Sequence, residues 1–216
     1  MNLRNDFISA LGLNLNQRQL EMLRDYCCLV WQKKNDLNLT SVFSKQEIWD
    51  RHITDGLFAA ALIKKLAGDK KNYTVADYGT GCGYIGISVK IALGEECNLA
   101  LIETLNKRCM FMDWCLMKLG LTGIKVVNAH ASTKGGHRGP FDFTLERAMG
   151  KLEDILPVCC TDLKSDGYFI AFQSEEQKPA GNEPEGTKYF YQKDLSCSYK
   201  LFGEDKVRYL AVFKKV

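Results

Sequence analysis

Proline and histidine are scarce in this chain, and long apolar runs are missing. Its 216 residues include only 4 prolines and 3 histidines. No low-complexity block or internal repeat interrupts the sequence, which favours one sizeable domain, or one domain with a small extension. No apolar run approaches the roughly 18 residues that a membrane span needs, so we expect no contact with a membrane. The polar start, Met1 to Asp6, lacks a signal-peptide core, so we expect a cytoplasmic protein.

The cysteines do not form a metal-binding or disulfide pattern. There are nine of them, an odd number, and none is arranged as Cys-x-x-Cys. Cys27-Cys28 and Cys159-Cys160 are adjacent pairs, which suit neither an easy disulfide nor a chelate. We interpret the cysteines as buried thiols in a reducing compartment and expect no metal.

Charge is nearly balanced. The formal net charge is +3 and the isoelectric point is near 8.3. This mild excess of positive charge permits nucleic-acid binding but does not demand it.

The first third of the chain reads as helical. Asn16 and Gln19 have capping-box spacing, and apolar residues follow at helical intervals as far as Trp31. Ser44 and Glu47 form a second capping box before a helix that ends near Lys65. We therefore predict an N-terminal helical extension over residues 1–66.

From residue 67 to 216 the pattern changes to strands alternating with helices. The expected strands are 73–78, 98–102, 124–127, 140–145 and 167–172. The expected helices are one that follows the glycines, runs through 87–93 and ends at 94–96, one over 105–119 with a Thr104 cap, and one over 151–161. This alternation predicts an α/β fold, a mostly parallel sheet with helices on both faces. Residues 188–195 and 207–213 are aromatic and β-branched runs, which we expect to add an antiparallel strand pair to the sheet.

A glycine-rich turn follows the first expected strand. Asp77 precedes Gly79, Gly81 and Gly83, and the next helix starts directly afterwards. Glycines there permit positive φ and close approach of a ligand, while the helix presents unpaired N–H groups. The alternative interpretation is a tight turn that binds no ligand.

The end of the second expected strand carries another acid. Glu103 would lie at the carboxyl edge of the sheet, where open α/β sheets bind ligands and where an acid can accept hydrogen bonds from ribose hydroxyls. This position serves NAD and S-adenosylmethionine (SAM) equally. A strand acid followed by three alternating glycines favours SAM, which has no pyrophosphate to neutralise.

Five segments together resemble one family. They are Asn38-Leu39-Thr40-Ser41, Arg51-His52-Ile53-x-Asp55-Gly56-Leu57, the run from Asp77 to Gly86, Glu103-x-Leu105-x-Lys107-Arg108-x-x-Phe111, and Arg147-Ala148. In this order they are similar to the RsmG (GidB) family, methyltransferases that modify a guanine of small-subunit ribosomal RNA at N7. The resemblance implies a Rossmann-like SAM-dependent methyltransferase sheet.

The resemblance also implies roles for residues. The cofactor contacts would be Asp77, Gly79, Gly81, Tyr84, Glu103, Ala131, Ser132 and Arg147, with Glu103 holding the ribose. The RNA side would include Asn38, Arg51, His52, Lys107 and Arg108. The implied partner is small-subunit ribosomal RNA, naked or within a ribonucleoprotein. The sequence does not fix the oligomeric state, and we expect a monomer.

Three positions depart from the family pattern. The family usually has Pro at Ile85, Arg-x-Glu at His130-Ala131-Ser132, and Lys-Gly at Gln173-Ser174. An acid near the adenine and a natural phosphate contact are therefore missing, which bears on the details of SAM and RNA contact and on the substrate.

Guanine N7 carries no proton, so methylation there needs no general base, and positioning alone can supply catalysis. We therefore name no catalytic residue. Arg147 would neutralise the SAM carboxylate or guide an RNA phosphate, and Glu146 would point to solvent or to a neighbouring Lys. Alternatives are a SAM methyltransferase acting on another RNA or a small molecule, and a SAM-binding RNA-binding module without activity. An NAD(P) oxidoreductase is disfavoured, because no catalytic Tyr–Lys or His pair stands out.

Overall fold

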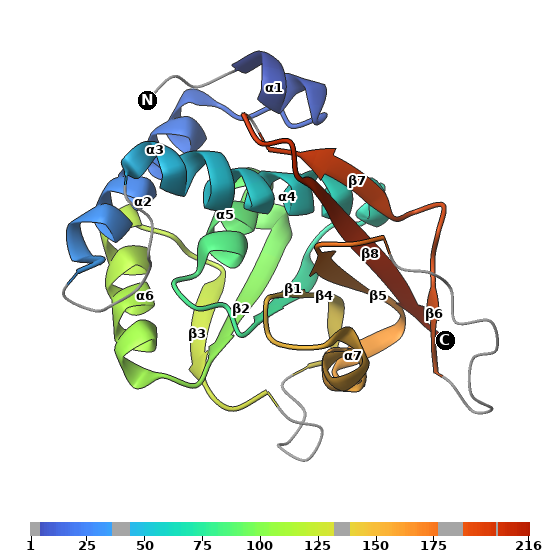
Figure 1. The fold of residues 1–216 in the computed structure, drawn as a ribbon. Coiled ribbons are helices and arrows are strands. Elements are labelled where there is room, and N and C mark those ends of the chain that lie inside the picture. Colours follow the sequence, from blue (N-terminus) through green and yellow to red (C-terminus); the bar gives the residue numbers. More distant parts are fainter. Residues whose placement is uncertain (1–4, 36–43, 132–138, 177–187, 202) are drawn as a thin grey trace.

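A mixed eight-stranded sheet forms the centre of the molecule (Figure 1). The computed structural model describes residues 5–35, 44–131, 139–176, 188–201 and 203–216. The strand order is β3-β2-β1-β4-β5-β8-β6, and β7 also pairs with β8. The strands are β1 (Tyr73–Tyr78), β2 (Cys97–Glu103), β3 (Ile124–Asn128), β4 (Phe141–Arg147), β5 (Leu163–Gln173), β6 (Tyr189–Tyr191), β7 (Cys197–Lys200) and β8 (Val207–Lys215).

The five strands from β1 to β5 are parallel, and the chain reverses direction in the sheet at β8. Strand β1 has β2 on one side and β4 on the other. Tyr78 pairs in register with Ile102 of β2 and with Glu146 of β4. The carboxyl ends of these three strands are therefore level, and the topological switch point of the sheet lies at β1. This confirms the predicted α/β architecture.

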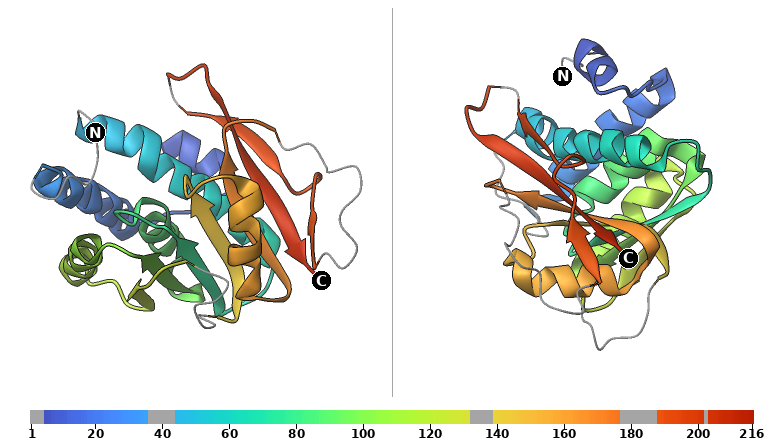
Figure 2. Two further views of the ribbon diagram at one scale, coloured as in Figure 1. Left: turned by 60° about the horizontal axis from the view of Figure 1, so that its bottom comes forward. Right: turned by 90° about the vertical axis from the view of Figure 1, so that its right-hand side faces the viewer.

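Helices cover both faces of the sheet (Figure 2). They are α1 (Asn5–Ala10), α2 (Gln17–Lys33), α3 (Lys45–Glu47), the π-helical η1 (Ile48–Ile53), α4 (Thr54–Ala67), α5 (Tyr84–Leu93), the 3-10 turn η2 (Gly94–Glu96), α6 (Asn106–Leu119) and α7 (Leu152–Thr161). Val75 and Leu99 face the larger core, under α2, α4, α5 and α6. Ala76 and Ala100 face the smaller core under α7. The alternation follows from the two-residue period of a strand.

The N-terminal helices support the glycine-rich turn and the helix after it. The capping box at the start of α2 is formed as predicted, because the Asn16 side chain accepts from the Gln19 N–H and Gln19 accepts from the Asn16 N–H. The Gln19 amide also donates to the carbonyl of Ile91 at the end of α5. Near the other end of α5, the buried Tyr26 hydroxyl donates to the Cys82 carbonyl at 2.7 Å. Helix α2 thus contacts both ends of α5.

One predicted helix contains a local widening. Ser44 caps the start of α3 by accepting from the Glu47 N–H at 3.0 Å, as expected. The helix then passes through the π turn η1 before continuing as α4. Thr54 donates its hydroxyl to the Trp49 carbonyl inside this turn. The π turn carries Arg51 and His52, and such turns occur frequently at functional sites.

Three details differ from the sequence predictions. The C-terminal part of the sheet holds three strands, because residues 188–195 contain the short β6 followed by a turn, and β7 then adds a strand that was not predicted. Thr104 does not cap α6, because its hydroxyl donates to the Glu103 carboxylate instead. Strand β4 extends through Arg147, which therefore ends the strand rather than following it.

Helix α5 lies unusually close to the sheet at Gly86. A Cβ atom there would lie 2.3 Å from the Leu101 side chain, so only glycine permits this approach. Within the described ranges, no helix is both long and apolar enough to cross a membrane.

Candidate functional site

A cavity of about 180 Å³ opens at the glycine-rich turn, at the carboxyl end of β1. Its lining includes five of the predicted cofactor residues, namely Asp77, Gly79, Gly81, Tyr84 and Arg147. Arg108 and Ala148 also line it. The cavity lies where an open parallel sheet binds its ligand.

Asp77 fixes the conformation of the turn from below. Its buried Oδ2 accepts hydrogen bonds from the Gly86 N–H at 2.9 Å and from the Thr80 hydroxyl. Burial raises the pKa of Asp77 to about 6, although these two hydrogen bonds oppose the shift. The carboxyl group therefore joins the end of β1 to the first turn of α5.

Glu103 is a charged acceptor at the neighbouring strand end. Its Oε1 accepts from the backbone N–H of Thr104 at 2.8 Å and of Leu105 at 2.9 Å. Its Oε2 accepts from the Gly81 N–H at 3.0 Å. Burial works to raise the pKa of Glu103, but the bonds from Leu105 and Thr104 outweigh it and lower the pKa below its usual value. The carboxylate is thus ionised; it already accepts from Gly81, Thr104, Leu105 and Arg108, and Glu103 is not among the residues that line the cavity.

The space around Gly81 is suited to a cofactor that approaches the backbone closely. The φ of Gly81 is +63°, and a Cβ built there would meet nothing within 4 Å, so a side chain would project into open space at the cavity. With the ionised Glu103 beside it, this cradle fits SAM. Because a β-branched residue is strained at this positive φ, Gly81→Val would disturb the fold as well as the site.

Tyr84 and Arg147 line the site, and His52 packs against Tyr84. The rings of His52 and Tyr84 stack with centroids 4.3 Å apart, and the Arg147 guanidinium lies 5.9 Å from the Tyr84 ring. Burial, followed by the positive charges of Arg147 and Arg51, lowers the pKa of His52 to about 3. His52 is therefore neutral and contacts the cofactor turn through Tyr84.

Arg147 is held by a buried acid that the sequence reasoning had not singled out. Asp55 of α4 has no exposed surface and accepts from Arg147 at 2.8 Å, from Arg208 at 3.1 Å and from the Tyr199 hydroxyl at 2.6 Å. Asp55 is part of the Arg-His-Ile segment, which was a signal. Tyr199 and Arg208 lie in the C-terminal strands and gave none.

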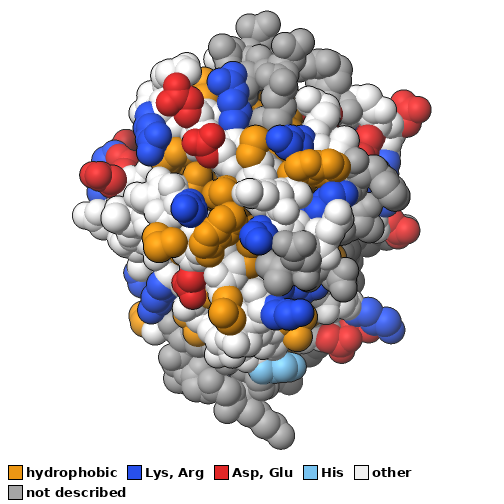
Figure 3. Space-filling view, turned by 90° about the vertical axis from the view of Figure 1, so that its left-hand side faces the viewer, with side chains coloured by type: hydrophobic (Ala, Val, Ile, Leu, Met, Phe, Trp, Pro, Cys, Tyr) orange, Lys and Arg blue, Asp and Glu red, His pale blue; other side chains and the backbone are white. Residues whose placement is uncertain are grey.

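The residues predicted to face RNA are divided among different environments. Arg51 is exposed and paired with Glu47 and Glu204, both at 2.7 Å. Lys107 is exposed at the start of α6, whereas Arg108 turns into the cofactor cavity and lies 3.5 Å from Glu103. Figure 3 shows Lys and Arg side chains scattered among hydrophobic ones on the face formed by α2 and α6.

Of three further predicted residues, the structure describes only Ala131. Asn38 and Ser132 lie outside the described residues. Ala131 follows β3, is half-buried against the smaller core, and is not among the residues that line the cavity.

Glu146 does not point to solvent or to a lysine, contrary to the sequence interpretation. Its side chain is buried and accepts from the Met149 N–H at 3.3 Å and the Gln173 amide at 3.4 Å. The cause is the sheet register, which places Glu146 between β1 and β5.

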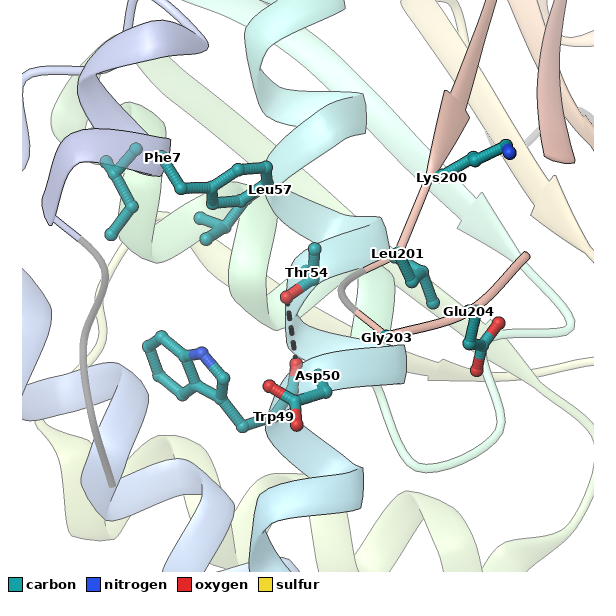
Figure 4. Close-up of a pocket in the computed structure, with 10 residues that line it drawn as sticks. Phe7, Trp49, Asp50, Thr54, Leu57, Lys200, Leu201, Gly203 and Glu204 are labelled. Atoms are coloured by element: carbon teal, nitrogen blue, oxygen red, sulfur yellow. Dashed lines mark hydrogen bonds between the residues drawn. The ribbon is translucent and has the colours of Figure 1, made fainter. Parts of the chain in front are cut away.

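A further cavity, of about 390 Å³, lies between the helices α1, η1 and α4 and the end of β7 (Figure 4). Phe7, Trp49 and Leu57 line one side of it, and Leu201 and Glu204 line the other (Figure 4). None of the predicted site residues that the structure describes lines it, and it lacks the turn between Asp77 and Tyr84, so we assign the cofactor to the smaller cavity. Among the side chains that the structure describes, no cluster of His, Cys, Asp or Glu could hold a metal ion.

Comparison with solved structures shows a Rossmann-like fold that this chain shares with a SAM-dependent methyltransferase. TrmN from Thermus thermophilus superimposes with a TM-score of 0.58 over 74% of this chain, at 19% identity. This chain spans about half (49%) of that protein. A SAM-dependent methyltransferase from Aquifex aeolicus gives a TM-score of 0.50 over 81% of this chain and 100% of its own, also at 19% identity.

Sequence comparison gives the family. The family described as rRNA small subunit methyltransferase G (GidB) matches residues 19–204. Ribosomal RNA small subunit methyltransferase G of Limosilactobacillus reuteri is 28% identical over 95% of this chain and 86% of its own. The protein of the same name from Alteromonas mediterranea is 33% identical over 78% and 75%, respectively. The chain belongs to this family, and the resemblance drawn from its five segments is confirmed.

Proposed function

We propose that this protein uses SAM to methylate N7 of a guanine in small-subunit ribosomal RNA, in the cytoplasm. The observation that carries the proposal is the cavity at the switch point, where the glycine-rich turn and the ionised Glu103 meet in a chain of the rRNA small subunit methyltransferase G family. SAM supplies an electrophilic methyl group on a sulfonium.

The residues of the chain would act by binding and orientation. Glu103 would accept from the ribose in place of one of its present donors, such as the Gly81 N–H, and Gly81 would let the cofactor approach the backbone. Arg147, fixed by Asp55, would contact the SAM carboxylate through the guanidinium nitrogens that do not hold Asp55. The neutral His52 would keep the Tyr84 ring in place without adding a charge beside a cationic sulfonium.

Positioning can be sufficient for this reaction because guanine N7 has a lone pair and no proton. A nucleophile held in line with the methyl group gains most of its rate from orientation. Asp77, whose pKa is about 6, lies beneath the cofactor turn. Its carboxyl group would hold the turn in its conformation and would not transfer a proton in the reaction.

The test is methyl transfer with defined components. Purified protein, SAM carrying a labelled methyl group, and small-subunit ribosomal RNA from a strain lacking this gene are incubated, and the nuclease digest is analysed by mass spectrometry. We expect labelled 7-methylguanosine at one nucleotide. Gly81→Ala should abolish the label, and calorimetry should show weak SAM binding for that variant.

Other results would select the alternatives. SAM binding with no transfer to RNA or ribosomal subunits would indicate a binding module. Label in another base or in a small molecule would overturn the substrate assignment.

A further inference from the structure

Another cavity, of about 330 Å³, adjoins the cofactor cavity at the carboxyl ends of β4 and β5 and is called the second cavity below. It is distinct from the 390 Å³ cavity described above. Arg147 and Ala148 line both the second cavity and the cofactor cavity, so a ligand in the second cavity lies next to a cofactor in the other. The reaction proposed above needs an acceptor nucleotide at such a place. The chemistry of the lining residues can therefore be compared with the chemistry of a nucleotide.

The side chains that line this second cavity are acidic at the floor and basic towards the rim. Two acids, Asp55 and Glu146, lie at the floor with exposed fractions of 0% and 1%. Lys206 is exposed at the rim, and Arg208 is half-buried between rim and floor. A nucleotide has a matching polarity, because its base carries hydrogen-bond donors and its phosphate is an anion.

The two acids at the floor differ in how well they are satisfied. Asp55 accepts two bonds from arginines and one from a tyrosine, none longer than 3.1 Å. Within the described part of the chain, Glu146 accepts two bonds, and both are long, at 3.3 and 3.4 Å. A carboxylate offers about four acceptor positions, so Glu146 has capacity for further donors.

Keeping Glu146 at this place is unfavourable for the fold alone. Burial, with the nearby charge of Asp77, raises the pKa of Glu146 to about 7, against the bond from the Met149 N–H. A buried carboxyl group with weak partners destabilises a protein unless a ligand compensates for it. Phe172, at the same cavity, offers an aromatic surface of the kind on which bases stack.

The base edges narrow the choice of ligand. Guanine presents two adjacent donors, N1–H and the N2 amino group, which match the two oxygens of a carboxylate. Adenine and cytosine present one donor beside an acceptor, and uracil presents one donor between two acceptors.

We propose that this second cavity binds the acceptor guanine, with the Glu146 carboxylate accepting from N1–H and N2–H and with Lys206 and Arg208 facing the phosphate. The assignment rests on the proposed function and makes Glu146 the residue that selects the base. Methylation at N7 leaves the base positively charged, because no proton is released. An ionised Glu146 stabilises that charge as it develops.

The experiment compares guanine with inosine, which lacks only the N2 amino group. Mass spectrometry first locates the nucleotide that the wild type methylates, and ligation then places inosine there in small-subunit RNA. Losing one charge-assisted hydrogen bond should lower kcat/KM of the wild type about tenfold or more. Glu146→Gln should lose about as much on guanine and treat the two RNAs within about twofold of each other.

Controls separate the possible failures. Glu175→Gln, an exposed acid beyond the end of β5, should behave as the wild type. Glu146→Gln is isosteric and removes a buried charge, so its unfolding temperature should equal or exceed that of the wild type. If the wild type methylates guanine, and Glu146→Gln keeps both the wild-type rate and the wild-type preference for guanine over inosine, the assignment of the second cavity is overturned while the proposed function stands. If the wild type transfers no methyl group to RNA, the proposed function and the assignment both fail.

Discussion

Arg147 faces the cofactor cavity while one nitrogen of its guanidinium binds the buried carboxylate of Asp55 at 2.8 Å. A planar fork with five donors can serve both partners, but an ammonium group acts as a single point charge. The arginine is therefore specified by two contacts, only one of which belongs to the cofactor.

Replacing Arg147 with lysine should separate these contacts. A lysine can still reach an acid, so the fold should lose little, whereas the second contact is lost. Because a charge-assisted hydrogen bond contributes roughly 1.5–3 kcal/mol, the dissociation constant for SAM should rise about tenfold or more. Calorimetry measures this directly, with the exposed Arg18→Lys as a control. A normal SAM affinity with reduced methyl transfer would assign Arg147 to the RNA, and normal values of both would reject either role.

Short-range signals in the sequence were sufficient to find the glycine turn and its acids. Asp77, Gly79 and Gly81 are close neighbours in the chain, and Glu103 marks a strand end that pattern alone could locate. The bond between Arg147 and Asp55 joins residues 92 positions apart, and no local pattern encodes it. Glu146 was misjudged for the same reason, since its burial depends on two neighbouring strands.

At the scale of one element, α6 presents two neighbouring cations to different surroundings. Lys107 is exposed, and Arg108 lines the cofactor cavity beside Glu103. Consecutive residues on a helix are about 100° apart around its axis, so adjacent positions need not share a face. Treating the pair as one RNA contact, as the sequence suggests, would combine two different effects.

The single variants should behave differently. Lys107→Ala should weaken RNA binding and reduce the slope of log affinity against log salt by roughly one, because one phosphate contact is lost. Arg108→Ala should weaken SAM binding instead. Filter binding at several salt concentrations and calorimetry measure the two effects. An unchanged slope for Lys107→Ala would return this lysine to the solvated surface of α6.

Helix α2 supports the cofactor turn through a buried hydrogen bond. The hydroxyl of Tyr26 donates to the Cys82 carbonyl, which follows Gly81 in the turn. A carbonyl that loses its buried partner costs about 1–3 kcal/mol. The N-terminal helices were predicted from their capping boxes, but their contact with the glycine turn was not, because it depends on packing between distant segments.

Tyr26→Phe should therefore lower the free energy of unfolding by about 1–3 kcal/mol and also weaken SAM binding. Urea denaturation and calorimetry measure the two quantities. Tyr191→Phe, on the half-exposed edge strand β6, is the control and should change neither. Lower stability with unchanged SAM affinity would show that the turn keeps its conformation without this bond.

At the scale of the whole molecule, two carboxyl groups at the ligand edge of the sheet, Asp77 and Glu146, differ in character from Asp142 at the opposite edge. At the ligand edge, burial raises the pKa of Asp77 to about 6 and that of Glu146 to about 7. At the opposite edge, near the start of β4, Asp142 accepts from Lys70, Lys164 and Thr74. Burial works to raise the pKa of Asp142, but its bonds to Lys70, Thr74 and Lys164 lower it to about 2. The ligand edge therefore retains groups that oppose folding at neutral pH, while the opposite edge stabilises the sheet.

The acid stability of the protein should accordingly depend on Asp142. A depressed pKa in the folded state means that the contribution is fully present above the unfolded value near 4 and is lost as pH falls towards 2. The shift corresponds to about 2 kcal/mol. Asp142→Asn should thus destabilise the protein by about this amount at pH 7 and by much less near pH 2. Urea midpoints measured from pH 2 to pH 7 test this, with the exposed Asp69→Asn as the matched control. A difference between Asp142→Asn and the wild type that is the same at every pH would show that packing around Asp142, rather than its charge, holds this edge of the sheet.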